Sequence, residues 1–388
     1  MPAVEFKNVD IMFGKSEQSK TALALLDQGG TRETILAECG AVLGVADASL
    51  SVEKSEICVL MGLSGSGKST LLRAVNGLNK VSRGSVFIYD DDGQSTDVAN
   101  CSSAILRQLR MQRVAMVFQQ FALLPWRTVA ENVGFGLELR GMAKDEIRKR
   151  VEEKLELVQL SQWADKQISQ LSGGMQQRVG LARAFATDAD ILLMDEPFSA
   201  LDPLIRNHLQ DELIELQQRL QKTIIFVSHD LDEALKIGSH IAIMEEGHIV
   251  QYGTPEDIIL NPANEYVARF VAHMNPLNVM RASSLMTPIE KALPHLGALQ
   301  LTLDKNMTLT GAQMGTQKLA AIDISAANNI ELNKNQIIIA PTTTGMREII
   351  ELRFETGNPV LLADDGKITG IIGDDEIYRN ILRKEETT

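Results

Sequence analysis

The chain is poor in cysteine. Its 388 residues include three cysteines, Cys39, Cys58 and Cys101, and no two of them are close in the sequence. This spacing predicts neither a disulfide framework nor a cysteine-based metal site. A chain without disulfides indicates a reduced, cytosolic compartment.

Long apolar runs and an excess of basic residues are also absent. No stretch approaches the roughly 18 apolar residues of a membrane-spanning helix. The N-terminal sequence MPAVEFKNVD lacks a basic region followed by an apolar core, so we expect no signal peptide. The formal net charge of −13 argues against a general nucleic-acid binder, which needs a basic face. We therefore expect no nucleic-acid partner, and any role at a membrane requires a second protein.

What is present is an ordinary globular composition in a long chain. Hydrophobic residues make up 44% and charged residues 23% of the sequence, which are typical values for folded domains. A length of 388 residues exceeds that of most single domains, so we expect two or three units.

The most informative stretch is GLSGSGKST, residues 62–70. It fits the phosphate-binding pattern G-x-x-x-x-G-K-[ST]. An apolar run at 57–61 predicts a strand before it, and residues 70–75 predict a helix after it. Glycines let backbone N–H groups surround an anion, and the helix directs its positive dipole end toward the same anion. The expected ATP-binding residues of this loop are Gly62, Ser64, Gly65, Ser66, Gly67, Lys68, Ser69 and Thr70. Lys68 should reach the β- and γ-phosphates, and Ser69 should bind Mg²⁺.

Strands and helices alternate after this loop. We expect strands at 84–89, 113–118, 191–194 and 223–227, and helices at 128–139, 144–158, 204–220 and 264–272. This alternation predicts an α/β fold with a largely parallel sheet. Ligands of such sheets bind beyond the carboxyl ends of the strands, where Gln119, the pair Asp195 and Glu196, and His229 all fall.

An unusual segment, residues 16–44, separates two predicted strands near the N-terminus. It contains a short helical run at 21–26 and a second helix that Thr31 caps and that extends to about Cys39. Strand alternation resumes at residues 45–52. We expect this insertion to be a surface elaboration of the sheet.

A second motif makes the chain resemble a known family. The stretch LSGGMQQR, residues 171–178, resembles the signature motif of ATP-binding-cassette (ABC) ATPases, and it lies between the phosphate loop and ILLMDE in that family's order. The similarity covers about residues 3–272. It implies an ABC domain at 1–272, with a RecA-like P-loop core, an antiparallel β subdomain and a helical subdomain at about 120–187.

The resemblance implies a magnesium site and catalytic residues. Asp195 would hold Mg²⁺ through water together with Ser69. Gln119 would touch the metal or the water and sense the partner, with the adjacent Gln120 as the alternative for this role. Glu196 would polarise the attacking water, and His229 would hydrogen-bond to the γ-phosphate.

Phe13 resembles the aromatic residue that stacks on adenine in this family. It ends the first predicted strand, where a core position is the alternative interpretation.

The signature implies a homodimer. Two copies of such cassettes pack head to tail, and each ATP lies between one copy's phosphate loop and the other's signature. The residues that would act on the other copy's ATP are Ser172, Gly173, Gly174, Gln176 and, in the loop 199–202, Asp202.

Several stretches indicate one branch of the family. The insertion and residues 195–238 and 253–271 resemble cassettes for uptake of quaternary ammonium compatible solutes, namely choline, glycine betaine and proline betaine. Within the insertion, the stretches ALLDQGGTRE and AVLGV are most similar to those of choline-uptake cassettes. An aromatic cage binds such cations, but only 4% of this chain is aromatic. The resemblance thus implies an ATPase subunit, peripheral on the cytoplasmic face of the inner membrane, with a separate permease and a periplasmic or extracellular solute-binding protein.

A smaller α+β unit is expected at 281–388, after a linker at 273–280. Residues 358–376 resemble the second half of a cystathionine-β-synthase-type (CBS) repeat, residues 341–343 its start, and residues 285–288 the beginning of a first copy. A plain hairpin and an oligonucleotide-fold-like tail are the alternatives. A CBS pair would suggest regulation by ionic strength or a nucleotide.

Other functions stay open at this point. A soluble cassette protein that acts on ribosomes or DNA is one alternative, although such proteins carry two cassettes or a long coiled coil with basic faces. The cassette of an importer for a different solute and an exporter subunit are the others.

Overall fold

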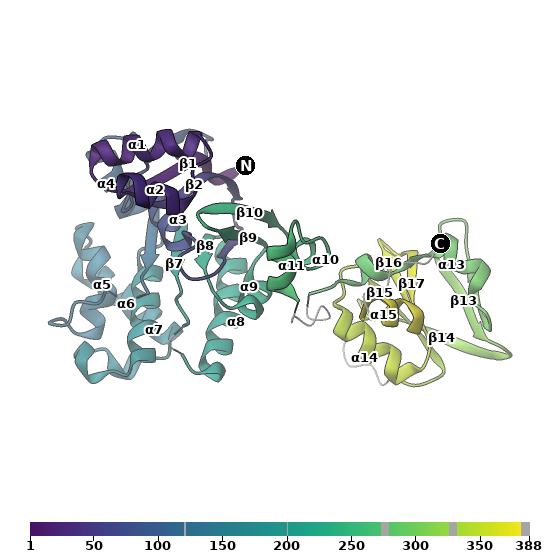
Figure 1. The fold of residues 1–388 in the computed structure, drawn as a ribbon. Helices are drawn as coiled ribbons and strands as arrows, with labels where there is room; N and C mark the ends of the chain where they lie inside the picture. Colours follow the sequence, from purple (N-terminus) through teal and green to yellow (C-terminus); the bar gives the residue numbers. More distant parts are fainter. Residues whose placement is uncertain (120–121, 200, 273–278, 326–331, 382–388) are drawn as a thin grey trace. The chain divides into compact units, whose positions relative to one another are not determined.

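The computed structural model describes residues 1–388 apart from 120–121, 200, 273–278, 326–331 and 382–388. It divides into two compact units, residues 1–272 and 273–388 (Figure 1). Most of the expected linker, residue 200 of the loop 199–202 and the alternative glutamine, Gln120, lie outside the described residues. Within the described residues, no helix is both long enough and apolar enough to cross a lipid bilayer.

The centre of the first unit is a six-stranded sheet. Its order is β10 (His248–Gly253), β9 (His240–Glu245), β3 (Ile57–Met61), β8 (Thr223–Val227), β7 (Ile191–Asp195) and β6 (Val114–Val117). The last five strands pair in parallel, and only β10 is antiparallel to its neighbour. Strands β3, β7 and β8 are buried along their whole length, as apolar strands covered on both faces must be. The predicted parallel α/β sheet is confirmed, and the carboxyl ends of β3, β6, β7 and β8 meet at one edge.

A second, antiparallel sheet covers this one. Its order is β2 (Val42–Glu53), β1 (Pro2–Phe13), β4 (Arg83–Tyr89) and β5 (Ser95–Asp97). Helix α3 (Lys68–Val75) lies between the two sheets, since one core cluster joins Phe6 of β1, Leu71 of α3 and Leu193 of β7. The helix that follows the phosphate loop is therefore held on two sides.

The remaining helices of the first unit surround these sheets. They are α4 (Ser103–Gln112), α5 (Val129–Leu139), α6 (Lys144–Leu157), α7 (Gly173–Ala186), α8 (Pro203–Leu220), α9 (Leu231–Ile237), α10 (Pro255–Leu260) and α11 (Glu265–Val271). Helices α5, α6 and α7 pack on one another as a helical subdomain (Figure 1). The expected helix at 128–139 begins where its capping signal lies, because Thr128 and Glu131 form a capping box.

The insertion forms two helices, α1 (Ser16–Asp27) and α2 (Arg32–Cys39). Thr31 caps α2 as predicted, and its hydroxyl accepts a hydrogen bond from the N–H of Thr34 at 3.3 Å. One boundary is corrected: β2 begins at Val42, so the insertion ends at residue 41, not 44. The strand starts early because Val42 and Leu43 already pair with Phe13 and Met12 of β1, whereas residues 43–46 are all buried and give no alternation.

The second unit is built on a seven-stranded sheet, in the order β11-β17-β16-β15-β14-β13-β12. Its elements are α12 (Ala282–Leu285), β11 (Thr287–Pro288), α13 (Ile289–Ala292), β12 (Leu299–Leu303), β13 (Leu309–Met314), β14 (Gln317–Asp323), β15 (Gln336–Pro341), α14 (Met346–Thr356), β16 (Val360–Asp364), β17 (Lys367–Ile372) and α15 (Asp374–Ile381). Strands β16 and β17 form the predicted hairpin, and its turn residues Asp365 and Gly366 have positive φ angles of 47° and 76°.

A substitution of Ile35 tests how much its packing stabilises the insertion. Its side chain is fully buried among the apolar residues of the insertion and the adjoining strands. We expect Ile35→Ala to leave a cavity and to destabilise α1 and α2 locally by about 2–4 kcal/mol. Hydrogen exchange over residues 16–41 should therefore accelerate. The neighbouring Leu36 is 51% exposed, so Leu36→Ala is the matched control and should change little; equal exchange in the two variants would contradict this packing.

Candidate functional site

The phosphate loop has a backbone that requires glycine. Gly62, Gly65 and Gly67 have φ angles of 141°, 82° and 104°. At Gly62 there is also no room for a side chain, because a Cβ atom would collide with the carbonyl oxygen of Met244 and lie 2.8 Å from the Ser66 hydroxyl. The loop therefore packs against the end of β9 and leads directly into α3.

Lys68 begins α3, and its side chain is buried inside the loop. The ammonium donates hydrogen bonds to the carbonyl oxygens of Gly62 at 2.8 Å and Leu63 at 2.9 Å. Burial lowers the pKa of Lys68, while the nearby carboxylates of Glu196 and Asp195 act in the opposite direction. A positive charge is thus held where the loop is shaped to receive an anion.

Asp195 ties the end of β7 to α3. It is fully buried, and its Oδ1 accepts a hydrogen bond from the Ser69 hydroxyl at 2.6 Å. Its Oδ2 accepts another from the Arg73 guanidinium at 2.8 Å. Ser69 and Arg73 are four residues apart and share one face of the helix. The carboxylate therefore has a partner for each oxygen, as a buried charge needs.

Glu196 follows β7, and its carboxylate contacts polar side chains that follow the two strands beside β7. Its Oε2 accepts a hydrogen bond from the Gln119 amide at 3.1 Å and lies 3.3 Å from Nδ1 of His229. Gln119 follows β6, and His229 follows β8. Glu196 itself has a φ of 47°, a conformation that is uncommon without glycine. Its N–H donates to the carbonyl of Val227 at 3.1 Å, which holds the strained residue in place.

Phe13 lies at the rim of the same region. The residue is 43% exposed at the end of β1. A Cβ atom on Gly44 would lie 2.7 Å from that ring and 3.1 Å from the methyl group of Thr70, so Phe13 and Thr70 are both neighbours of Gly44. The structure thus places an exposed aromatic ring beside the first turn of α3.

The signature residues form a separate group. Ser172 is exposed and caps α7, and its hydroxyl accepts a hydrogen bond from the N–H of Met175 at 3.4 Å. A Cβ atom on Gly174 would lie 2.9 Å from Leu201, whereas one on Gly173 would meet no atom within 4 Å. In the described part of the chain, no hydrogen bond joins these residues to the loop 62–70.

Gln176 and Asp202 already have partners in their own copy. The amide of Gln176 donates to the carbonyls of Ile168 at 3.3 Å and Leu171 at 3.1 Å. Asp202 caps α8, with its Oδ1 accepting from the N–H of Ile205 at 3.1 Å.

Three residues that are distant from the phosphate loop in the sequence form hydrogen bonds with it, and the sequence analysis predicted none of these contacts. The N–H of Gly247 donates to the carbonyl of Ser66 at 3.0 Å. The N–H of Leu63 donates to the Tyr266 hydroxyl at 3.4 Å. The Arg32 guanidinium donates to the carbonyl of Gly65 at 2.7 Å. No sequence pattern marks these contacts, whereas Arg73 could have been found from its spacing to Ser69.

The donor set of the site suits Mg²⁺. Ser69, Asp195 and Gln119 offer hydroxyl, carboxylate and amide oxygens, the hard ligands that this ion prefers. Among the described residues there is no group of three or more His, Cys, Asp and Glu side chains that could hold a metal. Mg²⁺ in nucleotide sites takes one or two protein ligands and completes its shell with phosphate and water, so the residues fit.

Comparison with known proteins gives the family. The sequence profile described as "ABC transporter" matches residues 45–199. The glycine betaine/carnitine transport ATP-binding protein GbuA of Listeria monocytogenes is 43% identical over 388 residues, 96% of each chain. The chain belongs to the ATP-binding subunits of ABC transporters.

Other relatives of this ABC subunit agree. OpuAA of Bacillus subtilis, a glycine betaine transport ATP-binding protein, is 42% identical and covers 95% of this chain and 90% of the relative. ProV of Escherichia coli, from a glycine betaine/proline betaine transport system, is 50% identical over 73% of this chain and 69% of its own length.

A solved structure shows the fold of the first unit. It is a dimeric ATP-binding cassette in a post-hydrolysis state bound to ADP and Pi, 30% identical, with a TM-score of 0.55 over 65% of this chain and 98% of that chain. The predicted P-loop ABC fold is confirmed, and the chain is an ATPase.

Two glycines of the loop offer a matched test of its geometry. Both Gly62 and Gly65 have positive φ, but a Cβ on Gly65 would meet no atom within 4 Å. We expect Gly65→Ala to cost about 1 kcal/mol through backbone strain alone. Gly62→Ala adds the collision with Met244 and should cost about 3 kcal/mol and abolish nucleotide binding. Thermal melts and calorimetric titration with ADP measure both quantities; equal behaviour of the two variants would contradict the described loop.

Proposed function

We propose that this ABC subunit hydrolyses ATP to power uptake of a quaternary ammonium compatible solute through a separate membrane permease. The observation that carries the ATPase part is the meeting of Gln119 and His229 at one oxygen of Glu196, next to a phosphate loop that contains Lys68. The solute class rests on the printed functions of GbuA, OpuAA and ProV, which all include glycine betaine. These relatives favour glycine betaine as the first solute to test, with choline, proline betaine and carnitine as competitors.

Nucleotide binding begins at the loop. The N–H groups at the start of α3 bind the phosphates, and Lys68 exchanges its carbonyl partners for β- and γ-phosphate oxygens. Phe13 stacks on the adenine, since its ring is exposed beside the loop. Ser69, Asp195 and Gln119 would hold Mg²⁺, which neutralises charge on the phosphates when bound.

Hydrolysis depends on the group around Glu196. Its carboxylate accepts a hydrogen bond from the attacking water and polarises it. Gln119 and His229 lie on either side of the same oxygen and orient it, and the exposed imidazole of His229 donates to the γ-phosphate. Asp195 does not take part in this step, because it is fully buried against Ser69 and Arg73.

A homodimer completes the site. A Cβ atom on Gly173 would meet no atom within 4 Å, so packing within one copy does not require a glycine there. The close approach of a phosphate bound to a second copy would require it. Ser172, Gly173 and Gly174 at the start of α7 then contact the partner's ATP. The amide nitrogen of Gln176 and Oδ1 of Asp202 are already bonded within their own copy. Each residue therefore contacts the partner's ATP only through its remaining side-chain oxygen. The solved cassette with a similar fold is a dimer.

The permease docks in the groove beside Gln119. Two adjoining pockets of about 450 and 370 Å³ share Leu78, Phe118 and Ala122, and the larger one also includes Gln119. An apolar protein segment in this groove would touch the residue that contacts Glu196, so docking and hydrolysis are coupled through Gln119.

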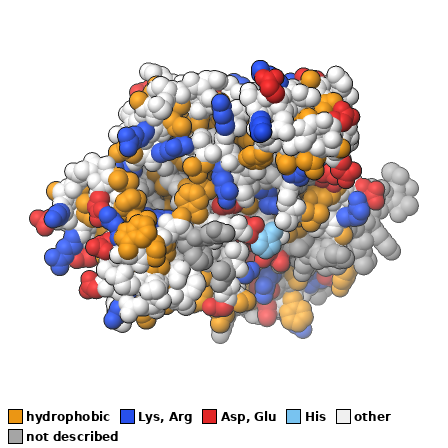
Figure 2. All heavy atoms as spheres, turned by 60° about the vertical axis from the view of Figure 1, so that its left-hand side comes forward, with side chains coloured by type: hydrophobic (Ala, Val, Ile, Leu, Met, Phe, Trp, Pro, Cys, Tyr) orange, Lys and Arg blue, Asp and Glu red, His pale blue; other side chains and the backbone are white. Residues whose placement is uncertain are grey.

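The remaining partners follow from the solute. A separate solute-binding protein selects the cation, and the ABC subunit is peripheral on the cytoplasmic face of the membrane. A nucleic-acid partner is not favoured: on the face drawn in Figure 2, Lys and Arg side chains are interspersed with hydrophobic ones and form no continuous basic surface.

The second unit has the order of elements expected of a CBS-like regulatory domain. Strand β15, helix α14, the β16–β17 hairpin and helix α15 follow one another, with β15 parallel to β16. This parallel, helix-connected arrangement supports a CBS-like domain over an oligonucleotide-fold-like barrel. We assign this unit a regulatory role in transport.

The function is tested by reconstitution. We expect the subunit to co-purify with its permease and to support ATP-dependent uptake of labelled glycine betaine in vesicles. Glu196→Gln should still bind ATP, accumulate as a dimer and lose at least about 100-fold in turnover, because the water loses its base. Glu215 is an exposed acid on α8, so Glu215→Gln is the control. Normal turnover in Glu196→Gln would refute the assigned base, and transport of unrelated solutes only would refute the solute class.

Deletion of residues 280–388 tests the second unit. We expect basal ATPase activity to persist, since the nucleotide residues all lie in the first unit. The response of uptake to ionic strength should change, because the regulatory unit is gone. Uptake is measured against salt concentration in vesicles that contain the permease. Identical salt profiles for the full and shortened chains would contradict regulation by this unit.

A further inference from the structure

The insertion begins and ends at the nucleotide site. The chain leaves β1 at Phe13 and returns to the sheet at Val42, and α1 and α2 lie over β1 and β2 (Figure 1). Helix α2 starts with Arg32, whose Nη1 donates to the carbonyl oxygen of Gly65 at 2.7 Å. A segment that looks like a surface elaboration in the sequence therefore reaches the middle of the phosphate loop.

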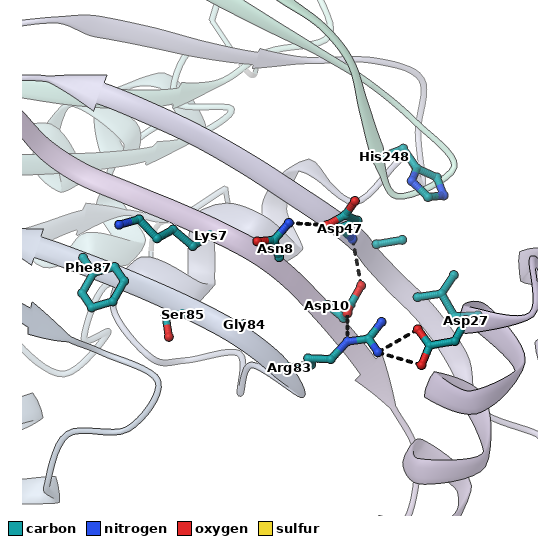
Figure 3. A pocket seen from close by; sticks show the side chains of 12 residues that line it. Lys7, Asn8, Asp10, Asp27, Asp47, Arg83, Gly84, Ser85, Phe87 and His248 are labelled. Carbon is teal, nitrogen blue, oxygen red and sulfur yellow. Dashed lines mark hydrogen bonds and ion pairs between the residues drawn. The ribbon is translucent and has the colours of Figure 1, made fainter.

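Ion pairs anchor the other helix of the insertion, α1, to the antiparallel sheet. Arg83 of β4 donates to both carboxylate oxygens of Asp27, the last residue of α1, at 2.7 and 2.9 Å. The same guanidinium donates through Nε to Asp10 at 2.6 Å, and Asp10 in turn accepts from the N–H of Asp47 at 2.8 Å. Figure 3 shows Arg83 between the two carboxylates. The side chain of Ile35 also anchors α2 in the core of the insertion. Together these contacts define where Arg32 lies.

The chemistry of Arg32 suits a phosphate. A guanidinium has five N–H donors in a planar fork that matches phosphate oxygens. Within the described residues, the bond to Gly65 is the one hydrogen bond found for this side chain, which is half-buried. No ion pair with a described carboxylate neutralises it. Among the described residues, its charge and its remaining donors therefore have no protein partner, and the guanidinium lies within hydrogen-bond distance of the phosphate loop.

We infer that Arg32 is a nucleotide-binding residue, which makes the insertion part of the ATP site. It holds the Gly65 carbonyl with one N–H and binds the diphosphate of the nucleotide with others. Lys68 supplies charge from inside the loop, and Arg32 supplies it from outside. This inference rests on the proposed nucleotide site, and it adds a residue from a segment outside the phosphate-loop motif.

The test compares ligands with and without phosphate on the full chain. Calorimetric titration gives the affinity for Mg²⁺·ADP, and competition at millimolar concentration gives that for adenosine. We expect Arg32→Ala to weaken ADP binding about tenfold, the size of one partly exposed hydrogen bond to a charged group, and to leave adenosine unchanged. Arg32→Lys should fall between, because an ammonium keeps the charge but lacks the fork. Arg148→Ala removes an exposed arginine from α6 and is the matched control, with no expected change.

Two results would overturn the inference. One is an ADP affinity for Arg32→Ala equal to that of the unmodified chain. The other is a parallel loss for ADP and adenosine, which would mean that the substitution disturbs the fold and not a phosphate contact. Failure of the unmodified chain to bind ADP would instead refute the proposed nucleotide site itself, so the two failures are distinguishable.

Discussion

The site depends on one buried carboxylate. Asp195 has no exposure to solvent, and a charge in that position is stable only if both oxygens have strong partners. Ser69 and Arg73 supply them from one face of α3, which places the end of β7 against the helix that follows the phosphate loop. Glu196 is the next residue, so the same contact brings its carboxylate to the phosphate loop.

The phosphate loop is also held from outside its own motif. Gly247 binds it from the turn after β9, Tyr266 from α11, and Arg32 from the insertion. Helix α11 is the last helix of the first unit, and its Tyr266 contacts the phosphate loop directly. The position of the loop therefore depends on three segments of the first unit that lie outside its own motif.

Much of this arrangement was predictable because the relevant signals are local. Buried apolar runs predict the parallel strands, and residues that follow such runs, Gln119, Glu196 and His229, must meet at one sheet edge. Thr31 and Thr128 mark helix starts through their own side chains. The end of the insertion was wrong by three residues, since a strand edge that is partly exposed has a weak alternation signal. Arg32 and Tyr266 gave no signal, because a single hydrogen bond between distant segments leaves no periodicity.

The sequence by itself determined the fold class, the phosphate loop, the residues at the strand ends and the family. These depend on spacing, on glycine conformations and on apolar periodicity, all of which are written in short stretches of chain. Only the tertiary structure decided that Asp195 bonds to Ser69 and Arg73, that Glu196 adopts a positive φ between Gln119 and His229, and that the insertion contacts the phosphate loop. The reason is that each of these contacts joins residues that are brought together by the pairing of strands distant in the chain and by the packing of helices on them, and not by neighbouring positions in the chain.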